Sequence, residues 1–202
     1  MASGSTKKLR ELGAEEGFSA DDLSVCWDHD LAIASLRYFD PAGSFAAEIG
    51  ELLAGPLPEP LRAHRRALAA AGDRASTGAE LVLAWRSPTE TLLVTADAGR
   101  LAAVAAFAAN RSDGCLVDQT GGILALVVDG ARARDLMLRL GSTDAIPALG
   151  EARTSRVAEL SVMALCTRPG EILLLVERVY GRHLMGWIRE TVADLKETGA
   201  PD

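Results

Sequence analysis

The chain has 202 residues, of which 49% are hydrophobic and 24% are charged, a balance that rules out a disordered chain. Acidic residues outnumber lysine and arginine by 28 to 21, so the net charge is −7 at neutral pH. Nucleic-acid binding needs a basic surface, and binding to single strands uses aromatic side chains, which make up only 4% here. We therefore expect a globular protein with no nucleic-acid partner.

The cysteines and the N-terminus point to the cytoplasm. Cys26, Cys115 and Cys166 lie far apart, which argues against a disulfide framework and against a zinc cluster. No apolar segment follows the lysines near the N-terminus, so no secretion signal is expected. The longest apolar runs, such as Ile123–Val128, are as long as a strand and far shorter than a membrane span. We expect a cytoplasmic protein that has no membrane partner.

The first part of the chain predicts an arm, a strand and two helices. Residues 1–24 are polar and contain glycine and serine, so we expect a flexible N-terminal arm. The alternation in Leu31–Arg37 predicts a strand, and an alanine-rich helix is expected over Leu61–Ala71, followed by a linker at Gly72–Gly78. Between them, helical spacing and a following proline-rich stretch predict a helix whose apolar face is Phe45, Ile49, Leu52 and Leu53.

The rest of the chain alternates strands and helices. Strands are expected at Leu81–Trp85, Thr91–Val94, Cys115–Asp118, Ile123–Val128, Val157–Cys166 and Ile172–Val176. Helices are expected at Asp97–Ala109, from an N-cap at Asp129 to Leu140 with Gly141 as the stop, and at the C-terminus. The C-terminal helix has the clearest pattern, with an apolar face of Leu184, Trp187, Ile188, Val192 and Leu195.

This order of elements predicts an α+β fold. Pairs of strands followed by a helix favour mixed or antiparallel sheets with split βαβ (ferredoxin-like) units, whose helices cover one face of the sheet. We expect residues 25–198 to form a single domain, with a possible sub-boundary near 72–78.

Several residues were weighed as functional candidates. His29 lies between Asp28 and Asp30, but neighbouring side chains on an extended chain point to opposite sides and rarely converge on one metal ion. His183 precedes Trp187 by one helical turn, which favours a boundary or interface residue. The basic group Arg62, His64, Arg65 and Arg66 could meet an anion or an acidic partner, although a solvated helix face is the favoured interpretation.

The remaining candidates favour structural roles. Cys115 begins an apolar strand and Cys166 ends one, which suggests small buried residues. Gly121-Gly122 precedes a strand, so it predicts a turn or bulge and not a phosphate loop. Asp118 stands before a glycine turn, where its side chain is expected to accept backbone N–H groups. The sequence therefore predicts no catalytic, cofactor-binding or metal-binding residues.

Four stretches together carry a resemblance to a known family. Leu116–Thr120 and Asp129–Leu136 resemble its Asp-x-Ser/Thr turn and its Gly-Pro-x-Ala-Arg segment with the following amphipathic helix. Trp85–Leu93 resembles its Trp-x-x-Pro-Asp-Glu-Trp-Leu-Leu segment, and Glu177–Leu184 with Trp187 resembles its terminal helix. In these features the chain resembles the gamma subunit of heterotetrameric sarcosine oxidase, which is related to the folate-binding fold of the glycine-cleavage aminomethyltransferase.

The resemblance implies a non-catalytic structural subunit of a flavoprotein oxidase. Such a complex oxidatively demethylates sarcosine to glycine and passes the one-carbon unit to tetrahydrofolate. It uses FAD, FMN, NAD, tetrahydrofolate and zinc, all on the alpha, beta and delta subunits, which would be the partners of this chain. No catalytic residue carries over from the family to this sequence.

Two other functions remain open at this level. The first is a stand-alone folate-binding protein like the aminomethyltransferase, with Asp118 near the pterin; against it, the chain is short for such an enzyme. The second is a gamma-like subunit of an oxidase or demethylase for another N-methyl amine. The sequence does not separate this second alternative from a sarcosine oxidase subunit, because another chain would choose the substrate.

Overall fold

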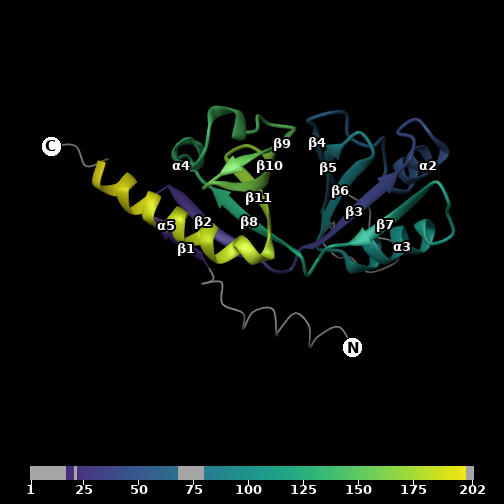
Figure 1. Cartoon of the computed structure of the whole chain (residues 1–202), viewed down its shortest axis with the longest axis horizontal. Coiled ribbons are helices and arrows are strands. Elements are labelled where there is room, and N and C mark those ends of the chain that lie inside the picture. Colours follow the sequence, from purple (N-terminus) through teal and green to yellow (C-terminus); the bar gives the residue numbers. More distant parts are fainter. Residues whose placement is uncertain (1–16, 21, 68–79, 199–202) are drawn as a thin grey trace. The chain divides into compact units, whose positions relative to one another are not determined.

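The computed structural model describes residues 17–20, 22–67 and 80–198, which form an α+β fold with two antiparallel sheets and four α-helices (Figure 1). The contacts divide the chain into two compact units. Unit 1 consists of Met1–His29, Gly121–Leu149 and Arg153–Asp202, and unit 2 consists of Asp30–Thr120 and Gly150–Ala152. Unit 2 is therefore an insertion between two strands of unit 1. Among the described residues, no helix is long and apolar enough to cross a membrane.

Unit 1 contains a six-stranded sheet in the order β1-β2-β8-β11-β10-β9. Its strands are β1 (Gly17–Ala20), β2 (Leu23–Asp28), β8 (Ile123–Asp129), β9 (Glu151–Val157), β10 (Leu160–Arg168) and β11 (Glu171–Glu177). Its helices are α4 (Ala133–Leu140), the short 3-10 helices η1 (Thr143–Ala145) and η2 (Arg178–Tyr180), and α5 (Gly181–Thr198). In Figure 1 the yellow α5 lies along this sheet, beside α4.

The core of unit 1 lies between the sheet and these two helices. Alternate residues of each strand point toward the helices, so Leu126 on β8 and Leu174 on β11 are fully buried there. The helix α5 buries Leu184 and Ile188 against them, one turn apart on a single face. Burial of this apolar area, at about 25 cal/mol per Å², is what fixes α5 on the sheet.

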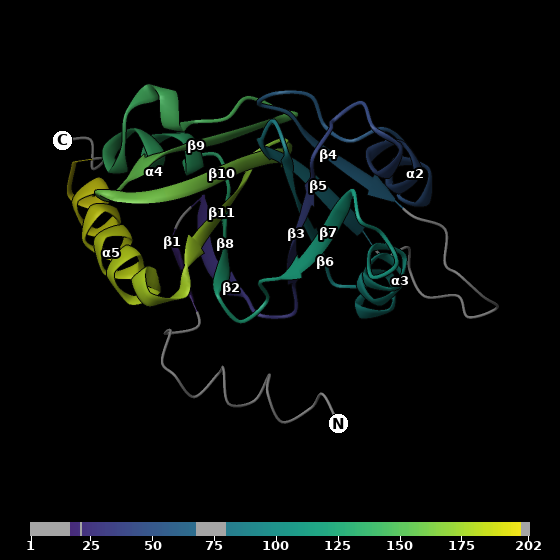
Figure 2. The same ribbon diagram turned by 45° about the vertical axis from the view of Figure 1, so that its right-hand side comes forward.

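Unit 2 contains a five-stranded sheet in the order β4-β5-β6-β3-β7. Its elements are β3 (Ala32–Tyr38), α2 (Ser44–Leu52), β4 (Ala63–Ala67), β5 (Glu80–Ser87), β6 (Glu90–Thr95), α3 (Ala98–Ala108) and β7 (Gly114–Asp118). Figure 2 shows α2 and α3 beside the strands of this sheet. Phe45 and Ile49 of α2 and Val104 of α3 are buried in one cluster with Leu83 and Leu93 of the sheet.

Much of this architecture follows the sequence patterns. The α+β class, the strand pair β5–β6 with its short connection, and the helices α2, α3 and α5 are confirmed. Asp97 caps α3 by accepting the backbone N–H of Arg100 at 3.0 Å. On α5 the expected apolar face is confirmed except at Trp187, whose side chain is 46% exposed.

The helix predicted over Leu61–Ala71 is wrong. Ala63–Ala67 form the edge strand β4, which pairs antiparallel with β5, from Ala63 opposite Ala84 to Ala67 opposite Glu80. Alanine and arginine are good helix formers, but the ladder of hydrogen bonds to β5 outweighs that local preference. Residues 68–71 of the predicted helix and the linker at 72–78 lie outside the described residues.

Two expectations near strand ends also differ from the structure. Where a flexible arm was expected over 1–24, residues 17–20 form β1 and β2 begins at Leu23; residues 1–16 lie outside the described residues. Asp129 is not an N-cap, because β8 continues through it and α4 begins only at Ala133, after Gly130 turns the chain with φ of +124°.

The segment Val157–Cys166, predicted as one strand, contains a hairpin. Ala158 and Glu159 form its turn with φ of +50° and +62°, and β9 and β10 lie on either side. Such turns usually carry asparagine or glycine, so Ala-Glu gave no turn signal.

Candidate binding groove

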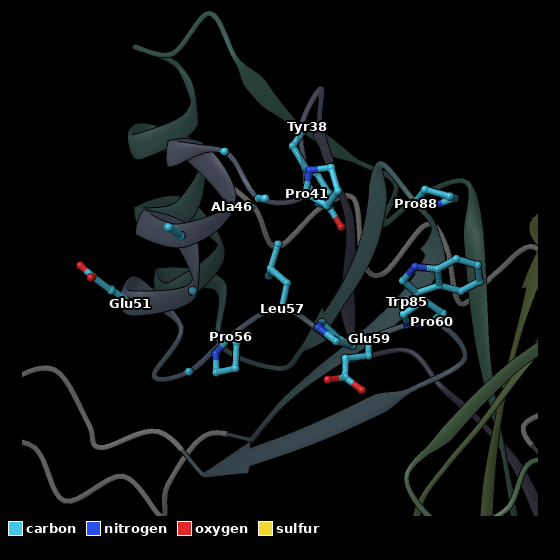
Figure 3. Close-up of a pocket in the computed structure, with 16 residues that line it drawn as sticks. Tyr38, Pro41, Ala46, Glu51, Pro56, Leu57, Glu59, Pro60, Trp85 and Pro88 are labelled. Carbon is cyan, nitrogen blue, oxygen red and sulfur yellow. The ribbon is translucent and has the colours of Figure 1, made fainter.

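The candidate site is an apolar groove of about 730 Å³ in unit 2 (Figure 3). It runs between α2 and the proline-rich segment that follows it, and the β5–β6 hairpin contributes Trp85 and Pro88. Prolines dominate its wall, and Leu57 points into it from the proline-rich segment. A groove of this composition binds by apolar contact and shape.

Small residues on α2 make one wall of the groove. Ala46, Ala47 and Gly50 lie on the helix face that borders it. A Cβ atom at Gly50 would lie 3.1 Å from the carbonyl oxygen of Gly55, so glycine lets the following segment approach the helix closely. The groove therefore depends on the way in which α2 ends.

The end of α2 is a Schellman motif. The N–H of Gly55 donates to the carbonyl of Gly50 at 2.8 Å, and the N–H of Ala54 donates to the carbonyl of Glu51 at 3.1 Å. Ala54 occupies the left-handed position of the motif with φ of +58°, where glycine is usual. This motif reverses the chain and starts the proline-rich wall.

Arg66 of β4 holds this turn in place. Its guanidinium donates to the carbonyl oxygens of Leu53 at 2.8 Å and Gly55 at 2.9 Å, and also to that of Pro56. These carbonyls follow a helix C-terminus, where a cation is electrostatically favourable. Burial lowers the pKa of the Arg66 guanidinium below its usual value. Arg66 thus ties the edge strand to the groove wall.

The basic group predicted on a solvated helix face is therefore distributed along a strand. Arg65 forms an ion pair with Glu80 of β5 at 2.5 Å. The ring of His64 lies 3.4 Å from the Arg66 guanidinium, and the pKa of His64 is lowered, first by burial and then by that cation. The backbone N–H of Arg62 donates to the carbonyl of Glu59 at 3.0 Å. Arg65 and Arg66 are thereby engaged with this chain and do not form a ready anion site.

The groove offers little for acid–base chemistry. Glu51 points away from it, and Glu59 lies at its edge near Pro60 (Figure 3). The hydroxyl of Tyr38 is buried and shares a hydrogen bond of 3.0 Å with Thr91. The described lining is mostly apolar, so the groove suits an apolar ligand or a protein segment.

A second hollow, of about 740 Å³, lies where β3 ends and β6 and β7 begin, and ion pairs line it. The carboxylate of Glu90 accepts the hydroxyl of Ser35 and lies 3.2 Å from the Arg86 guanidinium and 3.6 Å from that of Arg37. Cys115 borders this hollow and is exposed, so the expectation of a buried thiol is wrong at this position.

Arg111 also borders the second hollow and is fully engaged within the chain. Its guanidinium contacts both oxygens of Glu48 at 2.9 and 3.0 Å and both oxygens of Asp113 at 2.9 Å. It also donates to the hydroxyl of Ser44 at 2.7 Å and stacks over the ring of Phe107. The hydrogen bonds from Arg111 hold the pKa of Asp113 far below its usual range. The cluster joins α2 to the start of β7.

The other sequence candidates are scattered. Asp118 accepts the backbone N–H of Thr120 at 2.9 Å, as expected for a turn residue. Cys166 is buried as expected, and Gly121 lies in the turn between β7 and β8. His183 is exposed on α5, with its ring centroid 6.3 Å from that of Trp187. Among the described residues, no three histidine, cysteine or acidic side chains come together as a metal site would require.

Sequence reasoning missed the groove itself. The run of prolines from Pro56 to Pro60 was interpreted as a helix stop, which it is, but its rigid extended backbone also forms a wall. The other wall comes from Trp85 and Pro88, which lie about 30 positions later in the chain, and no local pattern reveals that pairing.

The arrangement of two antiparallel sheets with helices resembles the aminomethyltransferase folate-binding fold. The chain matches glycine cleavage system aminomethyltransferase T from Bartonella henselae with a TM-score of 0.59 and 13% identity. That match covers 83% of this chain and 45% of the other, so this chain spans less than half of the aminomethyltransferase.

A stronger match is a chain of the heterotetrameric sarcosine oxidase from Corynebacterium sp. U-96, a structure in complex with pyrrole 2-carboxylate. The TM-score is 0.72 at 17% identity, and the match covers 96% of this chain and 95% of that one. No family model and no curated protein matches the sequence. The structural likeness, at these identities, establishes the fold.

Proposed function

We propose that this chain is a non-catalytic structural subunit of a heterotetrameric flavoprotein sarcosine oxidase. The observation that carries the proposal is the end-to-end match with a chain of such an enzyme, in which neither chain has a large unmatched part. The match to an aminomethyltransferase, by contrast, leaves more than half of that enzyme without a counterpart. A chain that fits a subunit along its whole length fits the role of that subunit best.

In the proposed complex, sarcosine is oxidatively demethylated to glycine and the one-carbon unit passes to tetrahydrofolate. FAD, FMN, NAD, tetrahydrofolate and zinc would reside on the alpha, beta and delta subunits. This chain would contribute a folded scaffold and apolar contact surface. The groove beside α2 supports that role, because its prolines and alanines suit contact with another chain.

Two alternative functions remain. A gamma-like subunit of an oxidase for another N-methyl amine would have the same fold and the same subunit surface. A stand-alone folate-binding protein is the other alternative, favoured by the fold shared with aminomethyltransferase T. The carboxylate of Asp118, the residue considered for a pterin, already accepts the backbone N–H of Thr120. A folate would have to compete with that N–H for the carboxylate.

Affinity purification of the tagged full chain from its native cells tests the proposal. We expect larger chains to co-purify, to show flavin absorbance, and to turn over sarcosine. A flavin-containing complex that oxidises another N-methyl amine and not sarcosine would support the second subunit function. A colourless chain without partners contradicts the subunit proposal, and binding of tetrahydrofolate by that chain would then favour the stand-alone protein.

A further inference from the structure

The outward face of α5 carries aromatic and apolar side chains. Trp187 is 46% exposed and contacts the ring of His183, and Val179 and Tyr180, just before the helix, are 78% and 44% exposed. Leu184 and Ile188, next to Trp187 around the helix, face the sheet and are fully buried in unit 1. Tryptophan and tyrosine contribute most when a partner covers them, so this surface invites a protein contact.

Gly186 lies at the middle of this face. A Cβ atom there would meet nothing within 4 Å in this chain, and the residue is exposed. Glycine inside a helix is less stable than alanine by about 1 kcal/mol. No neighbour in the chain requires glycine at this position, and the missing side chain leaves room for another helix to approach closely.

The charges on α5 indicate what approaches. Arg182 and His183 precede Gly186, and Glu190 follows it by one turn; all three are exposed. Basic residues in the first turn oppose the helix macrodipole, so their place there does not serve the isolated helix. A second α5 running antiparallel would bring the basic first turn of each helix against Glu190 of the other.

We propose that two copies of this chain pair through α5, antiparallel about a two-fold axis near Gly186. In this register Trp187 of each copy packs over Gly186 of the other, and Arg182 and His183 lie beside Glu190 of the other copy. The contact is self-complementary, because a two-fold axis makes every contact twice. The proposal concerns a surface other than the groove and does not depend on the proposed function.

The size of the α5 surface sets the expected affinity of the dimer. A stable interface buries about 800 Å² on each partner, and one helix pair provides less. We therefore expect a reversible dimer that forms as concentration rises and weakens as salt screens the charges. Sedimentation velocity of the full chain from about 1 to about 500 µM should show the mass rising from monomer to dimer.

Charge exchange tests the register. Arg182→Glu or Glu190→Arg alone places like charges together at both symmetric contacts, and each should weaken dimerisation at least about tenfold. The double variant restores opposite charges and should recover the wild-type dissociation constant to within about threefold. Trp187→Ser should also weaken the dimer. The matched control is Asp135→Arg on the exposed face of α4, which should leave it unchanged.

Several results would overturn the proposal. One is a monomer at the highest concentration, and another is a dimer insensitive to Trp187→Ser and to both charge variants. Circular dichroism of each variant separates loss of pairing from loss of folding, and Trp187→Ser still tests the surface if a charge variant fails to fold. A monomeric chain whose capture of flavin-containing partners requires Trp187 would assign the surface to a different chain. In that case the dimer is rejected while the proposed function stands.

Discussion

Single residues determine the shape of the groove, and Ala54 is the clearest case. It adopts a left-handed conformation, with φ of +58°, that costs an L-residue about 1 to 2 kcal/mol more than it costs glycine. Part of that cost is offset, because an unfolded chain with glycine at this position would lose more conformational entropy on folding than one with alanine. The turn at the end of α2 is therefore maintained by its hydrogen bonds against a local cost.

Ala54→Gly should raise the free energy of unfolding by about 0.5 to 1 kcal/mol, because it removes the strain while keeping both Schellman hydrogen bonds. Urea denaturation measures this change. The control is Ala47→Gly, at an exposed position inside the same helix, which should lower stability by about 1 kcal/mol. Equal signs for the two substitutions would contradict the assigned conformation of Ala54.

Arg66→Lys should destabilise the chain by about 2 kcal/mol, because an ammonium group cannot reach the three carbonyls that the guanidinium holds together. The matched control is Arg65→Lys, the neighbouring residue on β4, whose ion pair with Glu80 can form equally with lysine. That control should change stability by less than about 0.5 kcal/mol. Denaturant titration of both variants measures their free energies of unfolding. Similar losses of stability in the two would contradict a special role for Arg66.

Asp113 should make stability depend on pH in the acid range. Hydrogen bonds from Arg111 and Ser44 lower its folded-state pKa below the value of about 3.9 in an unfolded chain. Its contribution is therefore present above that unfolded pKa and is lost as pH falls through the folded pKa. Asp113→Asn should flatten the pH dependence of the unfolding free energy below about pH 4. A variant curve that runs parallel to wild type there would contradict the assignment.

At the scale of elements, the sequence patterns predicted correctly the helices whose own residues carry the pattern. The apolar faces of α2 and α5 repeat at helical spacing, so tertiary packing and local pattern agree. They failed at β4, where alanine and arginine favour a helix but pairing with β5 decides. Trp187 shows a further limit of helical spacing, because an apolar residue on a helix can face a partner as readily as the core.

The helix α2 also forms a wall of the proposed contact groove. Ala47→Trp should fill that groove without disturbing the core, because Ala47 is exposed, and should lower recovery of flavin-containing partners severalfold. The matched control is Ala103→Trp, on the exposed face of α3, which should leave the recovery of flavin-containing partners unchanged. Co-purification with each tagged variant measures the effect. Unchanged recovery with Ala47→Trp would remove the groove from the contact surface of the subunit.

At the scale of the whole molecule, the fold class could be predicted but the path of the chain could not. Strand pairs and helices predict α+β, yet nothing local shows that β2 pairs with β8 across nearly 100 intervening residues. The groove was missed for the same reason, since its walls come from separate segments. Long-range pairing is a property of the complete core and leaves no mark on neighbouring residues.

The insertion makes the two halves of the chain unequal as fragments. Residues 30–120 contain every strand of the five-stranded sheet, whereas residues 121–202 lack β1 and β2 and with them the buried Leu23, Val25 and Trp27. We expect strand structure in the circular dichroism spectrum of the first fragment and an unfolded spectrum for the second. The opposite result would mean that the six-stranded sheet folds without its N-terminal strands.

The main segment of unit 2, Asp30–Thr120, begins and ends at adjacent points, because the N–H of Gln119 donates to the carbonyl of Ile33 at 2.8 Å. The described ends of the chain, at Gly17 and Thr198, both belong to unit 1, so a force that pulls them apart is carried by the β2–β8 ladder and bypasses the segment Asp30–Thr120. Mechanical unfolding should therefore proceed in a fixed order. The six-stranded sheet tears first, and only the release of its strands loads the inserted unit, which then opens as a separate event.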